Sequence, residues 1–233
     1  MIADNLAALL ERIDAAASRA GRDAGEITLV AVTKEVDAVA AQEAVANGLR
    51  DLGENRVQEL TKKREVLAGL NVRWHMIGTL QRNKVAQVVG QVVLIHSVDS
   101  AALAEAIGKR AQARGLRQDV LLEVNVGGES SKHGVGPGEE AIEVARGLLG
   151  IEGVRLRGLM TVAPQDNEAA ARGGFRVLRE LRDEIRARAS EVTELSMGMS
   201  EDFEIAIEEG ATIVRIGTAI FGPRGTKQTG PRK

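Results

Sequence analysis

The chain has 233 residues, of which 44% are hydrophobic and 27% are charged, and its formal net charge is −2. These values are ordinary for one globular domain, and the lack of a basic excess argues against binding to nucleic acid or to an anionic membrane surface. Because the chain has no cysteine, disulfide scaffolds, thiolate zinc sites and cysteine nucleophiles are excluded.

The first twenty residues have the pattern of an amphipathic helix and not that of a targeting signal. Leu6, Leu9 and Ile13 recur at helical spacing, while Asp4 and Glu11 interrupt any compact apolar run. No stretch of the sequence reaches the length of a membrane span. We therefore expect a cytoplasmic protein with no membrane partner.

The following segment predicts a buried strand and then a helix. Residues 27–33 are short, apolar and β-branched, which is typical of a strand buried on both faces. A helix is predicted over about residues 37–47, and Asn47-Gly48 ends it.

The same alternation continues to residue 216. Further apolar runs lie near residues 50–52, 72–77, 92–95, 119–126, 154–160, 193–195 and 212–216. Helical segments separate most of them, at about 81–89, 100–113, 139–148, 168–189 and 201–208. This pattern predicts an α/β fold, a single (β/α)8 TIM-type barrel with an extra N-terminal helix.

An open, doubly wound sheet is the alternative, because the second and seventh strands, at 50–52 and 194–195, have weak patterns. We expect residues 1–222 to form one barrel domain. Residues 223–233 are polar and rich in glycine and proline, and we expect them to form a flexible C-terminal tail.

Barrel active sites form at the carboxyl ends of the strands, and Lys34 follows the first predicted strand. An amine at the end of an apolar strand is partly desolvated, which lowers its pKa and suits it to Schiff-base formation with a carbonyl compound. The alternative is a lysine that extends its amine to solvent at the strand end. Position alone favours this second interpretation.

Two turns contain glycine next to hydroxyl side chains. Ser196-Met197-Gly198 follows the seventh strand and Gly217-Thr218 follows the eighth. Glycine lets backbone N–H groups approach an anion, and barrels frequently bind phosphate at these loops. The alternative is ordinary strand-to-helix turn chemistry, with Ser200 as a helix N-cap.

The charged residues near these turns refine the expectation. Glu201 and Asp202 would repel a phosphate, so we expect an anion nearer Ser196–Gly198. Arg215 fits a ligand contact and a structural ion pair equally well. The three histidines lack metal-ligand spacing, and we expect no metal site.

Eight strings, taken together, resemble the pyridoxal 5′-phosphate (PLP) homeostasis protein family, also called the proline synthetase co-transcribed family. That family has the fold of the alanine racemase N-terminal barrel. The strings are LVAVTK (29–34), DLGENRVQE (51–59), WHMIGTLQRNK (74–84), HSVDS (96–100), EVNVGGESSKHG (123–134), LRGLMTVAP (156–164), LSMGMSEDFEIAIEEGAT (195–212) and VRIGTAIFG (214–222).

The resemblance implies a PLP site. It implies that PLP is covalently bound to Lys34 as a Schiff base, and that Arg215 lies near the pyridine nitrogen. It also implies pocket positions for Asn55 and His75, with Met160 as a wall. The implied phosphate contacts come from Ser196, Met197, Gly198, Gly217 and Thr218.

The resemblance also bears on catalysis. An arginine at the ring nitrogen leaves the ring unprotonated and weakens its electron sink. Racemases with this barrel use a tyrosine from a second domain of the partner subunit as their second base. This sequence has no tyrosine and stops where that domain would begin.

We therefore expect a PLP-binding homeostasis protein without catalytic turnover. A weakly active PLP-dependent racemase and a phosphate-binding barrel enzyme without PLP are the alternatives. We expect a monomer, with PLP-dependent apo-enzymes as candidate recipients of the cofactor.

Overall fold

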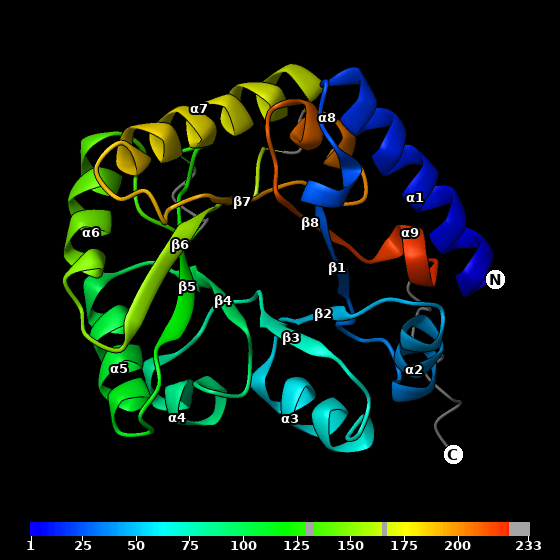
Figure 1. Cartoon of the computed structure of the whole chain (residues 1–233), viewed down its shortest axis with the longest axis horizontal. Helices are drawn as coiled ribbons and strands as arrows, with labels where there is room; N and C mark the ends of the chain where they lie inside the picture. Colours follow the sequence, from blue (N-terminus) through cyan, green and yellow to red (C-terminus); the bar gives the residue numbers. More distant parts are fainter. Residues whose placement is uncertain (129–132, 165–166, 224–233) are drawn as a thin grey trace, which may run out of the picture.

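Eight parallel strands close into a barrel in the order β1-β2-β3-β4-β5-β6-β7-β8. The computed structural model describes residues 1–128, 133–164 and 167–223. The strands are β1 (Thr28–Val32), β2 (Asp51–Glu54), β3 (Arg73–Met76), β4 (Leu94–Val98), β5 (Gln118–Glu123), β6 (Val154–Met160), β7 (Glu194–Ser196) and β8 (Ile213–Ile216). Figure 1 shows these strands as a central ring with the helices outside it.

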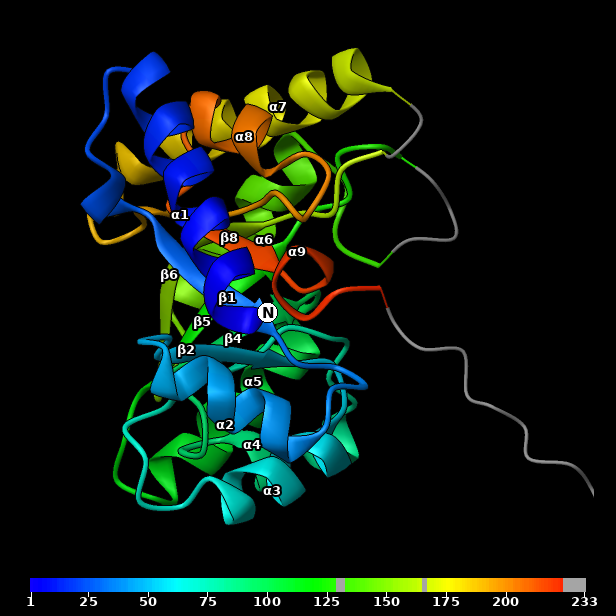
Figure 2. The same cartoon turned by 90° about the vertical axis from the view of Figure 1, so that its right-hand side faces the viewer.

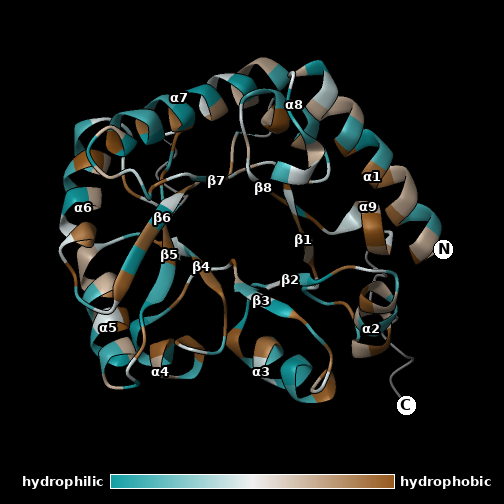
Figure 3. Ribbon diagram, viewed as in Figure 1, coloured by the Kyte–Doolittle hydropathy of each residue, from teal (hydrophilic) through white to brown (hydrophobic). Residues whose placement is uncertain are grey.

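The outer layer consists of α-helices and two short 3-10 turns. The helices are α1 (Ile2–Arg19), α2 (Ala38–Ala46), α3 (Val57–Val66), α4 (Val85–Val88), α5 (Ala101–Gln112), α6 (Glu139–Leu149), α7 (Glu168–Arg186), α8 (Phe203–Glu208) and α9 (Thr218–Phe221). The 3-10 turns are η1 (Ala24–Glu26) and η2 (Arg82–Lys84). Figure 3 shows hydrophilic and hydrophobic residues alternating along these helices, as expected for elements that bury one face.

The strands divide the core into two parts. Because successive side chains of a strand point to opposite faces, one set fills the barrel and the other lies under the helices. The apolar part of the interior set is Val30, Leu94, Leu121, Met160 and Ile213. The larger outer core includes Trp74 of β3, which is 6% exposed.

The extra N-terminal helix α1 lies along the outside of the barrel beside α8 and α9 (Figures 1 and 2). Asn5 Nδ2 donates a hydrogen bond to the Ile220 carbonyl at 2.9 Å. Arg12 and Arg19 form ion pairs with Glu204 at 2.8 and 3.1 Å. These contacts hold α1 against the side of the barrel that carries the last two helices, α8 and α9.

The prediction of a single (β/α)8 barrel with an extra N-terminal helix is confirmed, and the open-sheet alternative is wrong. The weakly predicted strands are present as β2 and β7. The segment predicted as a helix at 81–89 consists of η2 and the single-turn α4, and helix α3 had no predicted counterpart. Residues 224–233 of the predicted tail lie outside the described residues. None of the helices in the described ranges combines the length and apolarity needed to cross a membrane.

Candidate functional site

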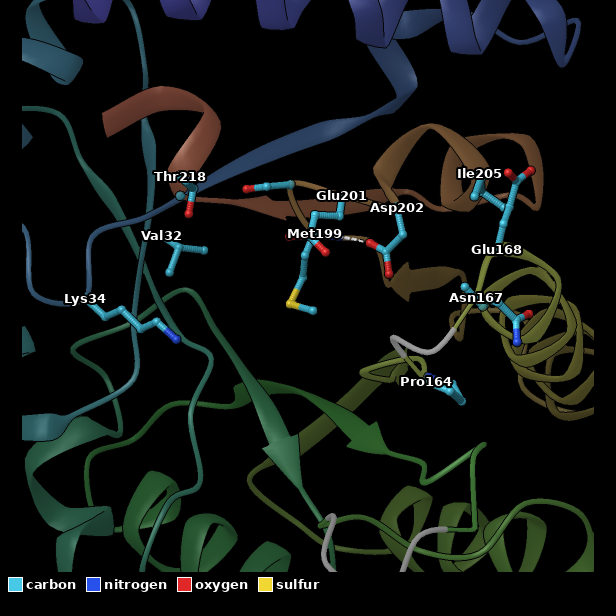
Figure 4. A pocket seen from close by; sticks show the side chains of 13 residues that line it. Val32, Lys34, Pro164, Asn167, Glu168, Met199, Glu201, Asp202, Ile205 and Thr218 are labelled. Carbon is cyan, nitrogen blue, oxygen red and sulfur yellow. Dashed lines mark hydrogen bonds between the residues drawn. The ribbon is translucent and has the colours of Figure 1, made fainter. Parts of the chain in front are cut away.

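A cavity of about 460 Å³ opens at the carboxyl ends of β1, β7 and β8, a size in the range of small-molecule sites. Figure 4 shows the Lys34 side chain pointing into it from the β1 side. The other lining residues come from the same end of the barrel: Val32, Pro164, Asn167, Glu168, Ala171, Met199, Ser200, Glu201, Asp202, Ile205, Gly217 and Thr218. The cavity therefore combines one amine with hydroxyls, carboxylates and apolar walls.

The turn that carries Lys34 is fixed on both sides of that residue. On one side, the buried carbonyl of Thr33 accepts hydrogen bonds from Lys63 Nζ and from the Val36 N–H. On the other side, the Glu35 N–H donates to Glu59 Oε2 at 3.0 Å. Glu35 has φ of +62°, and no other non-glycine residue in the described ranges has a positive φ. Such a backbone conformation is unfavourable for a side chain of this kind, so the surrounding contacts impose it.

A buried ion pair lies directly behind this turn. Glu54 Oε1 accepts hydrogen bonds from Lys63 Nζ and from Thr33 Oγ1, both at 2.6 Å. Burial raises the pKa of Glu54, and the hydrogen bonds from Lys63 and Thr33 oppose that effect. Lys63 therefore ties helix α3 to the end of β1, at the residue before Lys34.

The hydroxyl side chains of the cavity come from two loops. Ser200 lies in the loop after β7, and Thr218 begins α9 after Gly217. Their hydroxyls can donate hydrogen bonds to an anionic ligand group. The Met199 N–H is already used, because it donates to Asp202 Oδ1 at 2.5 Å.

Gly198 has a structural reason for being glycine. Its φ is +92°, and a Cβ at this position would lie 2.6 Å from Ala206 Cβ of helix α8. The turn therefore needs glycine to let α8 pack against it, and its backbone does not line the cavity. The role in phosphate binding that the family resemblance implies for Gly198 stays a prediction.

Three carboxylates, those of Glu168, Glu201 and Asp202, lie on the cavity rim away from Lys34. Burial raises the pKa of Asp202, and the Met199 N–H and the charge of Arg215 oppose that rise. An anionic group would therefore avoid this rim and lie on the side of Ser200, Gly217 and Thr218.

Ser196 and Arg215 lie deeper, inside the barrel. Arg215 Nη1 donates to Ser196 Oγ at 2.7 Å, and its Nη2 donates to the Thr161 carbonyl at 2.9 Å. Burial lowers the pKa of Arg215 to about 10, and the charges of Asp202 and Glu123 oppose that shift. The guanidinium thus stays charged near pH 7 and is bonded on two sides.

The comparisons with known proteins agree with the fold. The model of the family described as the alanine racemase N-terminal domain matches residues 5–225. A pyridoxal phosphate homeostasis protein of Aquifex aeolicus is 50% identical to this chain over 223 residues, which are 95% of this chain and 97% of that protein. The chain belongs to the pyridoxal phosphate homeostasis protein family.

Two solved structures resemble the structure of this chain. PipY of Synechococcus elongatus PCC7942, with PLP bound, is 36% identical, with a TM-score of 0.83 over 95% of this chain and 100% of that chain. An alanine racemase of Clostridium difficile 630 is 18% identical, with a TM-score of 0.75, and this chain covers 58% of its length. This second likeness shows the fold alone.

The structure brings together some of the residues that the family resemblance implies. Lys34, Gly217 and Thr218 line one cavity. Asn55 lies beside Lys34 in a smaller cavity of about 150 Å³ on the other side of the same turn.

Other implied residues lie outside the Lys34 cavity. Met160 belongs to the apolar barrel interior and Met197 to the outer core, and both are buried. Ser196 is fully buried against Arg215. His75 points toward the opposite end of the barrel, where Nε2 lies 2.9 Å from Asp51 Oδ1.

Ten of the thirteen residues that line the cavity were not predicted as site residues, and the polar ones among them include Ser200, Asp202 and Asn167. Ser200 was interpreted as a possible helix N-cap, but the N-cap position of α8 is Asp202. Asp202 itself and Asn167 were not predicted as pocket residues. Of these three residues, only Ser200 had a signal in the sequence that could have identified it. It is the second hydroxyl residue of the glycine-containing turn, after Ser196.

Proposed function

We propose that this chain binds PLP covalently through Lys34 and acts in PLP homeostasis without catalytic turnover. The observation that carries the proposal is the Lys34 amine, which points into a cavity whose lining includes the hydroxyl residues Ser200 and Thr218. Support comes from the relatives, which are named pyridoxal phosphate homeostasis proteins, and from PipY, whose structure contains PLP.

The residues present fit PLP. The amine of Lys34 would hold the aldehyde carbon, and Ser200, Gly217 and Thr218 would hold the phosphate. Arg215 is the buried cation below these loops and would face the ring nitrogen. When bound, PLP supplies an electron-withdrawing ring that stabilises negative charge on an attached carbon.

The chain's own groups favour retention of the cofactor over turnover. Arg215 only donates hydrogen bonds and stays charged, so a ring nitrogen facing it would remain unprotonated. The chain contains no tyrosine to act as the second base that racemases of this fold use. A weakly active amino-acid racemase remains the alternative function.

The test compares lysine variants of the PLP-loaded protein. We expect Lys34→Ala to lose the visible absorption band of bound PLP, and borohydride reduction of the wild type to tag Lys34. Lys62→Ala is the control, because Lys62 is exposed on helix α3 and should keep the band. A band that persists in Lys34→Ala, with a tag on another lysine, would contradict the proposal.

Two further measurements separate homeostasis from catalysis. We expect the loaded protein to transfer PLP to an apo-enzyme, and we expect no racemisation of common amino acids. Racemisation that scales with protein concentration would instead establish the alternative function. The cytoplasmic location and the monomeric state stay predictions.

A further inference from the structure

A continuous file of polar side chains crosses the inside of the barrel. Arg215 Nη1 lies 2.7 Å from Ser196 Oγ, which lies 2.8 Å from His96 Nδ1. His96 Nε2 lies 2.9 Å from His75 Nδ1, and His75 Nε2 lies 2.9 Å from Asp51 Oδ1. All five residues are buried. Because barrel interiors are usually filled by branched apolar side chains, this file is a feature that needs an explanation.

The lower end of the file reaches a second cavity, of about 370 Å³, at the amino ends of the strands. Asp51 and His75 line that cavity. The other charged groups that face this end come from β3, β5, β6 and β7, and they are Arg73, Asp119, Arg157 and Glu194. The Asp51 carboxylate is therefore the one charged group of the file that lies beside this cavity.

The upper end of the file lies below the Lys34 cavity. Arg215 precedes Gly217 and Thr218, which line that cavity. Two carboxylates interact with the Arg215 charge, those of Asp202 and Glu123, and Glu123 is itself influenced by Asp99 and His133. The file thus connects the neighbourhoods of the two cavities.

The hydrogen bonds of the file have a definite direction. Arginine only donates, so Ser196 Oγ accepts from Arg215. In the described part of the chain, the Ser196 hydroxyl has one other partner, which is His96 Nδ1. The hydroxyl hydrogen therefore points at Nδ1, and this nitrogen carries no proton.

The two histidines continue the same direction. With Nδ1 unprotonated, His96 carries its proton on Nε2 and donates to His75 Nδ1. His75 then carries its proton on Nε2 and donates to the Asp51 carboxylate. Burial, together with the charge of Arg215, lowers the pKa of His96 well below its ordinary value, which is consistent with a neutral ring.

We propose that Asp51, His75, His96 and Ser196 are positioning residues for Arg215. The Asp51 charge at the lower end fixes the tautomers of both histidines, and these fix Ser196 as an acceptor for the guanidinium below the Lys34 cavity. The link to PLP rests on the proposed function, whereas the link from Asp51 to Arg215 does not.

The first experiment needs no cofactor. The chain has three histidines, so ¹⁵N NMR of histidine-labelled protein reports each ring separately. We expect His75 and His96 to be Nε2-protonated at neutral pH, with His133 as the solvent-facing reference. Nδ1 protonation of His75 or His96 in the wild type would overturn the proposal, whatever the behaviour of any variant.

The second experiment changes the charge at the lower end. In Asp51→Asn the amide can donate to His75 Nε2, as in the protease triad, where the same substitution leaves the histidine in the wrong tautomer. We expect both histidines of the file to switch to the Nδ1-protonated form. Asp119→Asn is the matched control, because Asp119 lines the same cavity and contacts Arg155.

The third experiment uses the PLP-loaded protein. We expect Asp51→Asn to shift the pH midpoint of the visible PLP band, and Asp119→Asn to leave it at the wild-type value. If the tautomers of His75 and His96 switch in Asp51→Asn but the pH midpoint of the PLP band equals that of the wild type, the link to the cofactor is overturned. If the wild-type protein does not bind PLP, the proposed function is wrong. The NMR result still tests the direction of the hydrogen bonds between Arg215 and Asp51.

Discussion

At the scale of single residues, Lys34 and Lys63 show how two lysines take different roles at the turn after β1. Lys34 points into the cavity, whereas Lys63 is 7% exposed and bonds to Thr33 and Glu54. A helix that buries a lysine needs a partner for its charge. The partner here is Glu54, so the pair connects α3, β2 and the end of β1.

Removal of the Lys63 amine tests this connection. Lys63→Met leaves the Glu54 carboxylate buried without its cation, and breaking such a pair costs about 3–5 kcal/mol. We expect that loss in the free energy of unfolding, measured by denaturant titration near pH 7. Lys62→Met is the control, because Lys62 is the exposed neighbour on the same helix. Equal midpoints for the two variants would contradict this role of Lys63.

The same variant has an expected pH dependence. Burial raises the pKa of Glu54, and loss of Lys63 raises it further. A carboxyl whose pKa is higher in the folded state binds its proton more tightly there, so it favours folding below its ordinary pKa. This advantage is lost as the pH rises through the folded-state pKa. The deficit of Lys63→Met should therefore shrink toward acid pH.

Residue-scale reasoning from the sequence led to the cavity where a position depends only on the strand that precedes it. Lys34, Gly217 and Thr218 follow well-defined strands, and all three line the cavity. The sequence favoured Ser196 over Ser200 as the anion contact, but the sequence pattern does not fix where β7 ends. The strand ends at Ser196, so Ser196 points into the barrel and Ser200 lies on the loop above.

At the scale of elements, α3 shows why a helix can escape prediction. Its buried residues are Val57, Leu60 and Lys63. Because one of the three buried positions is a lysine, the apolar residues do not recur at helical spacing along the sequence. Strands β2 and β7 were weak for a related reason. Asp51 and Glu194 face the charged lower cavity, where an apolar pattern is not required.

Two adjacent glycines of helix α7 make a matched pair. Gly173 is exposed, and a Cβ there would meet nothing within 4 Å. We expect Gly173→Ala to raise the free energy of unfolding by roughly 0.5–1 kcal/mol, because alanine has the higher helix propensity. Thermal and denaturant unfolding measure this change.

Gly174 is buried, and a Cβ there would lie 2.8 Å from Val126 Cγ2. Overpacking of this kind costs about 1–3 kcal/mol, which outweighs the gain in propensity. We expect Gly174→Ala to be less stable than the wild type. If both alanine variants were stabilised, α7 would not pack against the loop after β5 as closely as the structure shows.

At the scale of the whole molecule, ion pairs connect both α7 and α1 to the C-terminal end of α8, where Glu208 and Glu209 lie. Glu209 is 5% exposed and accepts hydrogen bonds from Arg172, Arg176 and Arg179 of α7. On the other side, Arg19 of α1 bonds to Glu208 at 2.9 Å. These contacts fasten the elements that close the barrel on the side of the N-terminal helix.

Glu209→Gln should reveal this connection through its pH dependence. Burial raises the pKa of Glu209, but the hydrogen bonds from Arg176 and Arg172 outweigh it, so the net shift is downward. A lowered pKa stabilises the folded state above the ordinary carboxyl pKa, and this is lost as the pH falls through the folded-state value. We expect a deficit of about 2 kcal/mol at neutral pH, which disappears in acid.

Unfolding free energies measured from neutral to acid pH provide the check, with Glu180→Gln as the control. Glu180 is exposed on α7, the helix that carries the three arginines. A deficit for Glu209→Gln that stayed constant with pH would show that the arginines do not act on its charge.

The position of Trp74 gives the molecule a built-in optical probe. It is the single tryptophan of a chain without tyrosine, and it is buried on β3 next to His75. Intrinsic emission excited in the tryptophan absorption band, beyond the absorption of phenylalanine, therefore originates from one side chain at one depth in the barrel wall. A chromophore on Lys34 would quench that emission by energy transfer from a single donor, so arrival and departure of the cofactor can be timed without a label.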